Sequence, residues 1–404
     1  MRFTPLIFVL GIAAATVSGV ASAQKPKDEP RRPRLSADAD TNDTRSYYDF
    51  GLEKLERDPE LAADAFYWAA RIDPTSADAY YARRCAMLLS DRFRFQRYFE
   101  DDRRTLQSSE IRHIDSLYLY SLTINPFLYR KLDLRLFNDY IQIWSEEFAR
   151  RNNMSAGEVR FAVEREMAQE SSVLMRARQA YGYARFPDAL RYYAEAINRA
   201  RHKAGLREER GWLFFQIGQA DSALVELNLA LDELRKTDKK DVVYVYESKA
   251  LLEHSIGMVY QRLGNFAAAK ESFGRALQED LSYFPAHVQL AFIGMNANDT
   301  TTALSELDLA VQIRPDDPVL HYTYGFALAT VGKFEDAQVQ LVKAIEVDPS
   351  FAASYYVLGQ VLDALGKPTD ALAQYQTFLA HASRQDLRRK EAEQRIQMAV
   401  KEDR

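Results

Sequence analysis

The side chains that could bind a metal ion in this chain are six histidines and a single cysteine, Cys85. His287 and His321 stand 34 residues apart, so they would hold equivalent places in two neighbouring structural units and could bridge a metal. The chain has no HExxH pattern, however, and no cysteine pair to complete a zinc site. We therefore interpret these two histidines as packing residues, and we expect neither a metal nor a cofactor.

Cys85 is the side chain that could act as a thiol nucleophile. It lies in YYARRCAMLL, an apolar helical pattern in which a cysteine is typically a small buried residue. The flanking Arg83 and Arg84 could lower the pKa of its thiol, which is the alternative interpretation. Since the chain has no GxSxG pattern and no marked acid–base pair, we predict that it is not an enzyme.

Gly-Lys pairs at Lys333 and Lys367 superficially resemble a phosphate-binding loop. The glycine spacing in GFALATVGKF and GQVLDALGKPT is too long for such a loop, and Phe and Pro follow the lysines where Ser or Thr is required. Both pairs fall on the turn between two predicted helices. The pattern therefore indicates helix-breaking turns and does not favour nucleotide binding.

Small residues recur every 34 residues in the C-terminal half of the chain. Two such sets are Gly257, Ala291, Gly325 and Gly359, and Ala269, Ala303, Ala337 and Ala371. A fixed period of this length is typical of stacked helical hairpins, because one hairpin cannot bury its apolar face alone. The period favours a binding scaffold over an enzyme.

The stretch 318–351 resembles a tetratricopeptide repeat. The matching residues are the small pair Gly325 and Ala337, the turn residue Gly332, and Ala344 and Pro349. The same register predicts repeats at 170–203, 204–237, 250–283, 284–317, 318–351 and 352–385, in an array over 170–385 with an insertion at 238–249. The resemblance implies an all-α fold, a right-handed superhelical solenoid of stacked antiparallel helix hairpins.

Two of these repeats depart from the pattern at the turn between their helices. The repeat 170–203 has no glycine there, and the repeat 284–317 has Asn298. We assign both from the small residues that keep the register, such as Ala189 and Ala303.

Helical patterns also precede the array. Residues 47–90 resemble one N-terminal hairpin of the same type with a following helix. Residues 91–169 have the apolar spacing of an irregular helical region, or of degenerate repeats, with Asn125-Pro126 between two helices. The many aromatic residues of this region either form a core or line a pocket.

The chain ends in a charged helical pattern over 386–404. Its thin apolar stripe consists of Leu387, Ile396 and Val400. We predict a C-terminal capping helix, because a solenoid needs a polar cap to protect its last hairpin. A helix on a membrane surface is the alternative, but the apolar stripe is sparse for that role.

Residues 1–23 have the pattern of a secretory signal peptide, with Arg2, an apolar run and the cleavage site Ala21-Ser22-Ala23; a membrane anchor is the alternative. The charged, proline-containing stretch 24–46 predicts a disordered linker. The chain has one cysteine, so it cannot form an intramolecular disulfide. An exported protein without disulfides is more typical of a bacterial periplasm than of a small secreted scaffold. We expect an exported protein, periplasmic or secreted.

The charge of the chain limits the class of partner. The formal net charge of −5 is mildly acidic and argues against a nucleic acid. No other stretch is long and apolar enough to span a bilayer, so we expect no membrane span after signal cleavage. A protein or peptide is the remaining class of partner.

Tetratricopeptide arrays resemble one another in placing the first helix of each hairpin on the concave side, so the resemblance implies a groove. The usual groove positions correspond here to Arg178, Trp212, Phe215, His254, Met258, Arg262, Phe292, Met295, Asn296, Tyr322, Phe326, Tyr356 and Gln360. This set is mainly aromatic and apolar, and it lacks the lysines with which some family members grip a carboxylate. We therefore expect a protein or peptide partner with apolar anchors.

These observations predict a non-catalytic exported scaffold that mediates protein–protein interaction or complex assembly in the bacterial periplasm or cell envelope. Two alternatives stay open. The chain could cover its own groove, with its C-terminal helix or with residues 91–169. It could also be a structural oligomer in which the apolar face pairs with itself.

Overall fold

The structure is a computed structural model that describes residues 29–91, 109–155, 157–161, 172–237 and 249–402. The regular elements of these residues are α-helices, and none of them is a β-strand. The described chain divides into two compact units. The first unit lies within 84–279, and the second combines 29–83 with 280–402.

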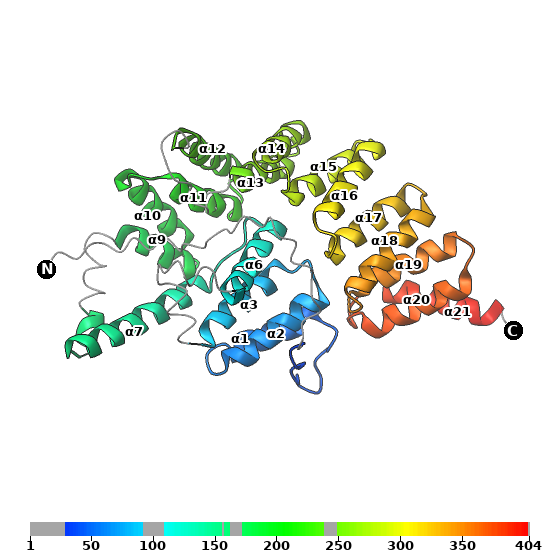
Figure 1. Ribbon diagram of the computed structural model, residues 1–404, viewed down its shortest axis with the longest axis horizontal. Helices are drawn as coiled ribbons and strands as arrows, with labels where there is room; N and C mark the ends of the chain where they lie inside the picture. Colours follow the sequence, from blue (N-terminus) through cyan, green and yellow to red (C-terminus); the bar gives the residue numbers. More distant parts are fainter. Residues whose placement is uncertain (1–28, 92–108, 156, 162–171, 238–248, 403–404) are drawn as a thin grey trace. The chain divides into compact units, whose positions relative to one another are not determined.

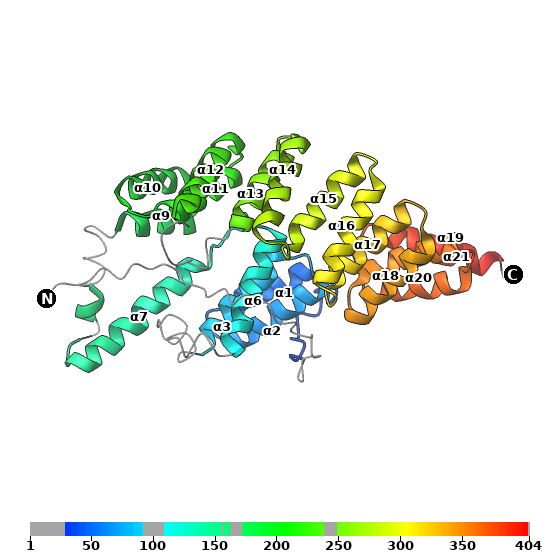
Figure 2. The same cartoon turned by 45° about the horizontal axis from the view of Figure 1, so that its top comes forward.

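The first unit contains consecutive antiparallel hairpins. Within residues 172–279, each helix packs against the next one along the chain, as Figures 1 and 2 show. The pairs are α9 (Ser172–Gly182) with α10 (Phe186–Arg199), α11 (Ala204–Gln216) with α12 (Ala220–Thr237), and α13 (Lys249–Arg262) with α14 (Phe266–Glu279). They are preceded by α6 (Ser109–Ile124) and α7 (Asp133–Asn152), with α3 (Ala77–Leu89) at the boundary between the units.

The second unit contains hairpins of the same kind. They are α15 (Phe284–Asn296) with α16 (Thr300–Ile313), α17 (Pro318–Thr330) with α18 (Phe334–Val347), and α19 (Ala352–Ala364) with α20 (Pro368–His381). The N-terminal hairpin, α1 (Thr44–Lys54) with α2 (Pro59–Ile72), belongs to this unit, as does α21 (Arg389–Glu402). The predicted all-α fold of stacked antiparallel hairpins is confirmed. Residues 238–248 of the predicted insertion lie outside the described residues.

The turn inside each hairpin of the array requires a left-handed residue. In these turns the residues with positive φ are Gly218, Gly264, Gly332, Gly366, Ala184 and Asn298. Asn153, which also has positive φ, follows α7 instead. Glycine adopts this conformation without steric cost, and asparagine tolerates it better than alanine does. The two repeats that lack a turn glycine therefore keep the same turn geometry. The backbone of Ala184 is strained, because its Cβ disfavours a positive φ.

The small residues of the 34-residue period lie where paired helices approach most closely. A Cβ atom added to Gly257 would come within 2.5 Å of the Phe273 ring, and one added to Gly359 within 2.7 Å of the Tyr375 ring. Both rings belong to the second helix of the same hairpin and are buried. A glycine in the first helix therefore makes room for a large residue in the second.

Residues 29–43 differ from the predicted disordered linker. Arg32 donates from Nε to the Tyr47 hydroxyl at 2.8 Å, and its guanidinium lies 4.9 Å from the Trp68 ring. Asp43 then caps α1, which begins at Thr44. The charged composition of this stretch predicted a solvated segment. Arg32 instead packs its guanidinium against the aromatic rings of Tyr47 on α1 and Trp68 on α2.

This N-terminal segment also contacts the last repeat. A carboxylate oxygen of Asp40 accepts from the Ser383 hydroxyl at 3.0 Å and from the Arg384 backbone N–H at 2.6 Å. Asn42 donates from Nδ2 to the Ala380 carbonyl at 2.8 Å. Residues more than 330 positions apart in sequence are thus hydrogen-bonded within the second unit.

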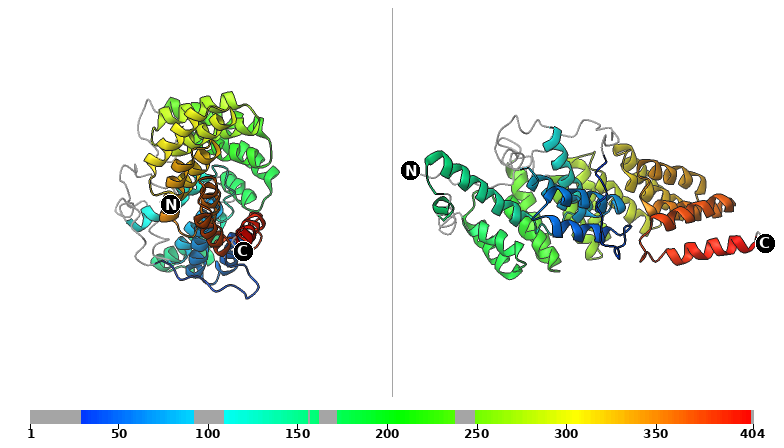
Figure 3. Two further views of the ribbon diagram at one scale, coloured as in Figure 1. Left: turned by 90° about the vertical axis from the view of Figure 1, so that its right-hand side faces the viewer. Right: turned by 90° about the horizontal axis from the view of Figure 1, so that it is seen from below.

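The C-terminal helix α21 packs against α20 (Figure 3). Ala392 is fully buried there, and Ile396 packs against the core of the last repeats. The prediction that Leu387 belongs to the apolar stripe is wrong, because 93% of this residue is exposed. It precedes the helix, so the helical spacing assumed from the sequence does not apply to it.

Within the part of the chain that the structure describes, no helix has the length and apolar character needed to cross a bilayer. Residues 1–23, the predicted signal peptide, lie outside the described residues.

Candidate protein-interaction surface

The two histidines at equivalent places lie in the interior of their hairpins. The Nδ1 atom of His287 is 2.6 Å from a carboxylate oxygen of Glu306, and that of His321 is 2.8 Å from the side-chain oxygen of Gln340. Each contact joins a first helix to its second helix, so both side chains connect the two helices, as packing residues do. Among the described residues, no three His, Cys, Asp or Glu side chains gather as a metal site would require.

Cys85 is fully buried in α3. A thiol must be accessible to react with a substrate or an oxidant. Its burial therefore favours the interpretation as a small packing residue over that of a nucleophile.

Two predicted groove residues of the first unit, Trp212 and Phe215, are covered by a segment of the chain itself. The ring of Phe127 stacks on the ring of Phe215, with centroids 3.7 Å apart and an angle of 23° between the planes. Gln216 donates from Nε2 to the backbone carbonyl of Phe127 at 2.7 Å. Phe127 is 5% exposed, so this contact excludes water from the face of α11.

Two residues further along, the same segment contacts α9 and α11. The Tyr129 hydroxyl donates to the carbonyl of Tyr181, 2.9 Å away. The Arg130 guanidinium lies 4.9 Å from the ring of Trp212, and its backbone N–H donates to the Tyr181 hydroxyl at 3.3 Å. We call the surface formed by Tyr181, Trp212, Phe215 and Gln216 the occupied face.

Arg178 lies on α9, as Tyr181 of the occupied face does, and belongs to a partly buried ionic cluster. It pairs with Glu209 at 2.7 Å, and the Tyr193 hydroxyl donates to the same carboxylate at 2.7 Å. Burial alone would raise the pKa of Glu209, but the positive charge of Arg178 and the hydrogen bonds outweigh it and lower that pKa. The Arg178 guanidinium therefore forms an intramolecular ion pair with Glu209.

The remaining predicted residues of the first unit differ in exposure. His254 is buried against the Phe273 ring, and burial lowers the pKa of its imidazole to about 3. Met258 is half-buried against the core cluster of α11 to α13, and Arg262 is exposed with its guanidinium 5.0 Å from the Phe215 ring. Of these three, Arg262 is the one that a partner could reach directly.

The second unit leaves more of its predicted groove residues accessible. Phe292 on α15 is 54% exposed and Phe326 on α17 is 51% exposed, at equivalent places in adjacent repeats. Asn296 and Gln360 are exposed polar residues on α15 and α19. We call the surface of Phe292, Asn296, Phe326 and Gln360 the open face.

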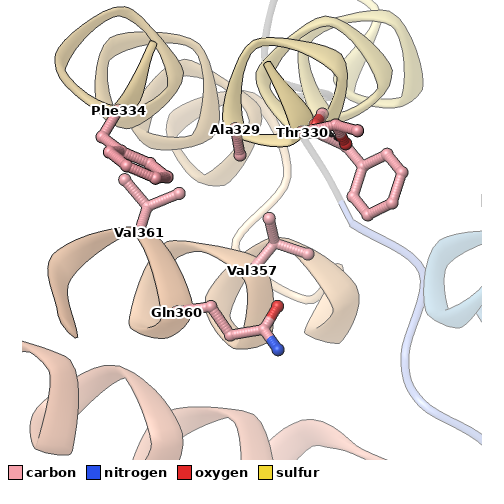
Figure 4. Close-up of a pocket in the computed structure, with 7 residues that line it drawn as sticks. Ala329, Thr330, Phe334, Val357, Gln360 and Val361 are labelled. Atoms are coloured by element: carbon pink, nitrogen blue, oxygen red, sulfur yellow. Dashed lines mark hydrogen bonds between the residues drawn. The ribbon is translucent and has the colours of Figure 1, made fainter. Parts of the chain in front are cut away.

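A shallow cavity of about 220 Å³ borders the open face between α17 and α19. It is lined by Phe326, Ala329, Thr330, Phe334, Val357, Gln360 and Val361, and most of these are apolar (Figure 4). Phe326 and Gln360 are among the predicted groove residues, whereas the other five lining residues are not. Val357 and Val361 lie two residues before and after Gly359, and their role in lining a cavity has no signal of its own in the sequence.

The other predicted residues of the second unit are mostly covered. Tyr356 is 6% exposed, and the Arg388 guanidinium lies 5.6 Å from its ring. Tyr322 stacks edge-on against Phe351 at 5.1 Å, and Met295 is half-buried against the core. The C-terminal segment therefore covers one end of the predicted groove, while Phe292 and Phe326 stay exposed.

Comparisons with known proteins agree with this architecture. Residues 255–318 and 326–386 match the family described as tetratricopeptide repeat. An uncharacterized protein of Haemophilus influenzae is 27% identical over 100 residues, which cover 25% of this chain and 56% of that protein, little more than half its length.

Solved structures with the same kind of fold share less identity. YrrB, described as a TPR protein with an unusual peptide-binding site, is 20% identical with a TM-score of 0.39, over 52% of this chain and 97% of YrrB. The C-terminal part of a TPR repeat-containing protein from Cytophaga hutchinsonii is 15% identical with a TM-score of 0.43, over 51% of this chain and 78% of that one.

Hairpins of constant length with left-handed turns define a helical-repeat scaffold. The residues that match the family fall on these hairpins, so the hairpins of 255–318 and 326–386 are similar to tetratricopeptide repeats. Repeats of this kind stack into extended concave surfaces that typically bind protein or peptide partners.

Proposed function

We propose that this chain is an exported scaffold of the bacterial periplasm or cell envelope, which holds a protein partner by apolar anchors on its open face. The observation that carries the proposal is the exposure of Phe292 and Phe326, each more than half accessible. Exposed aromatic residues that recur along one set of helices typically mark a partner site. Export is supported by the signal-peptide pattern of residues 1–23.

The chemistry of the open face favours an apolar segment with some hydrogen-bonding capacity. Phe326 and Phe334 border a cavity that could accept one partner side chain, and Gln360 at its rim offers a donor and an acceptor. Deeply buried aromatic anchors commonly supply most of the binding energy of such an interface. The partner is thus a peptide or helix with one or two large apolar residues.

The test is capture of a partner from an envelope extract by the mature chain and by the double variant Phe292→Ala and Phe326→Ala. The proposal predicts loss of the captured partner with an almost unchanged thermal midpoint, because both residues are exposed. A double substitution of Val225 and Val339 to Ala removes exposed apolar residues from second helices and should leave capture intact. Equal capture by all three proteins would refute the proposal.

Self-association is the alternative outcome. If a second copy covers the open face, mass measurement will show a dimer at low micromolar concentration. The Phe292→Ala and Phe326→Ala double variant would then be monomeric.

A further inference from the structure

Residues 125–131 join α6 to α7 without forming a helix, and they lie on the occupied face of α9 and α11. We propose that the occupied face is a second peptide-recognition site, which the chain fills with its own segment. Its ligand class is a peptide with the order aromatic–apolar–tyrosine–arginine, as in Phe127 to Arg130. This site is separate from the open face, and it does not depend on the function proposed for that face.

The occupied face contacts the backbone of the segment as well as its side chains. The Gln216 amide donates to the Phe127 carbonyl at 2.7 Å, and the Tyr181 hydroxyl accepts from the Arg130 N–H at 3.3 Å. The Gln216 amide also donates to the Tyr181 hydroxyl at 3.2 Å, which orients both groups toward the segment. Side chains that bond the main chain of an extended segment can hold any peptide that follows the same path.

The side chains of the segment supply the selectivity. Phe127 requires a ring at its position, because it stacks on Phe215 and packs into the core cluster of α11 to α13. Arg130 places a cation at the Trp212 ring, where an uncharged residue would lose the attraction between the charge and the π face. Both positions would therefore discriminate between peptides.

The segment is prearranged for this contact. Asn125 accepts from the Phe127 N–H at 3.0 Å through its side-chain oxygen, which fixes the turn that leaves α6. Linkage to α6 and α7 gives the segment an effective concentration of about millimolar or more, so it outcompetes a free peptide of the same sequence. A free peptide can bind only when the internal segment is weakened.

The experiment uses the full mature chain and a fluorescent peptide of residues 124–132 added in trans. The double variant Phe127→Leu and Arg130→Gln keeps most of the buried volume but weakens the internal segment. Lys131→Gln, at an exposed position of the same segment, is the matched control. Fluorescence anisotropy gives the affinity of the peptide for each protein.

We expect the peptide to bind the double variant at least about tenfold more tightly than the wild type or Lys131→Gln, because competition by the tethered segment is reduced. Adding Phe215→Ala should abolish this binding, and a peptide with Phe127→Ala and Arg130→Ala should not bind. The proposal is overturned if the folded double variant binds the peptide no better than the wild type does, or if Phe215→Ala has no effect. The substitution Phe326→Ala should leave peptide binding unchanged, which separates this site from the open face.

A second measurement does not depend on the folding of the double variant. In hydrogen exchange of the wild type and of Gln216→Ala, the amides of residues 125–131 should exchange faster in the variant while those of 204–237 keep their protection. A ligand-like segment can leave its site while the repeats stay folded. Equal loss of protection in both regions would show that the segment is ordinary core, and would overturn the proposal.

Discussion

Arg71 in α2 and Asp348, which follows α18, form an ion pair with 3.0 Å between Nε and Oδ1, across 277 residues of sequence. The carboxylate of Asp348 also accepts from the hydroxyl and the N–H of Ser350. The side chain of Asp348 is only 9% exposed, so this contact is shielded from solvent. The N-terminal hairpin is thereby fixed to the C-terminal repeats of the second unit.

The substitution Arg71→Met should lower the free energy of unfolding by about 1–3 kcal/mol, because it leaves a largely buried carboxylate without its cation. The matched control is Arg45→Met, which breaks an ion pair with Asp49 whose side chains are 85% and 60% exposed. Exposed pairs contribute little, so the control should change stability by less than about 0.5 kcal/mol. Urea denaturation measures both, and equal effects would contradict the importance of the Arg71 contact.

The left-handed turns predict opposite effects of two reciprocal substitutions. Ala184 has φ 55° and is exposed, so Ala184→Gly should relieve strain and stabilise the chain by about 0.5–1 kcal/mol. Gly332 has φ 78° and no neighbour within 4 Å of an added Cβ, so Gly332→Ala should destabilise by about 1 kcal/mol through strain alone. Thermal unfolding of both variants checks the signs, and a stabilising Gly332→Ala would refute this account of the turns.

Two glycines of the same hairpin should respond in opposite ways to alanine. Gly257→Ala would place a methyl group 2.5 Å from the ring of Phe273, which is fully buried and cannot move away, so a loss of about 1–3 kcal/mol is expected. Gly274 in α14 has no neighbour within 4 Å of an added Cβ. Gly274→Ala should therefore stabilise the helix by about 1 kcal/mol. A destabilising Gly274→Ala together with a neutral Gly257→Ala would contradict the packing described for this hairpin.

The burial of His254 makes stability depend on pH in a defined direction. Burial lowers the pKa of its imidazole to about 3 in the folded chain, while the unfolded chain has a pKa near 6.5. Between these values the unfolded state binds a proton that the folded state does not bind, so stability falls as the pH falls from 6.5 toward 3. From pH 7 to pH 5 this residue should remove about 2 kcal/mol.

The variant His254→Gln lacks this titration. Its free energy of unfolding should decline less than that of the wild type between pH 7 and pH 5, by about the 2 kcal/mol that the imidazole contributes. The substitution His202→Gln, at an exposed position, should leave the pH dependence of the wild type unchanged. Parallel pH profiles for His254→Gln and the wild type would show that this histidine is not buried in its neutral form.

The hairpins could be predicted from the sequence because their determinants are local and periodic. Gly257 and Phe273 lie 16 residues apart, and the same relation recurs in Gly325 and Leu341 and in Gly359 and Tyr375. A contact that repeats at a fixed spacing leaves a pattern in the sequence. The stretch 318–351, for example, contains the two helices α17 and α18.

The sequence left open whether the chain covers its own groove, with residues 91–169 or with its C-terminal helix. The residues that make these contacts could not be predicted, because each contact is a single long-range one. Phe127 follows the predicted break at Asn125-Pro126, but nothing in its neighbourhood indicates that Phe215 is its partner. Aromatic residues are common both in hydrophobic cores and on binding surfaces, so the residue type alone does not distinguish the two. The hydrogen bond between Asp40 and Ser383 is likewise a single long-range contact, since neither residue is one of the small residues that recur every 34 positions.

The central claim is that the open face of α15 and α17 holds a protein partner. A photo-crosslinking amino acid placed at position 326 tests it most directly, with position 339 on α18, where Val339 is 52% exposed, as the matched control. The account predicts one defined crosslinked partner from position 326 in an envelope extract, its loss in the presence of Phe292→Ala, and no such product from position 339. Crosslinking of the same products from both positions, or of none from position 326, would contradict it.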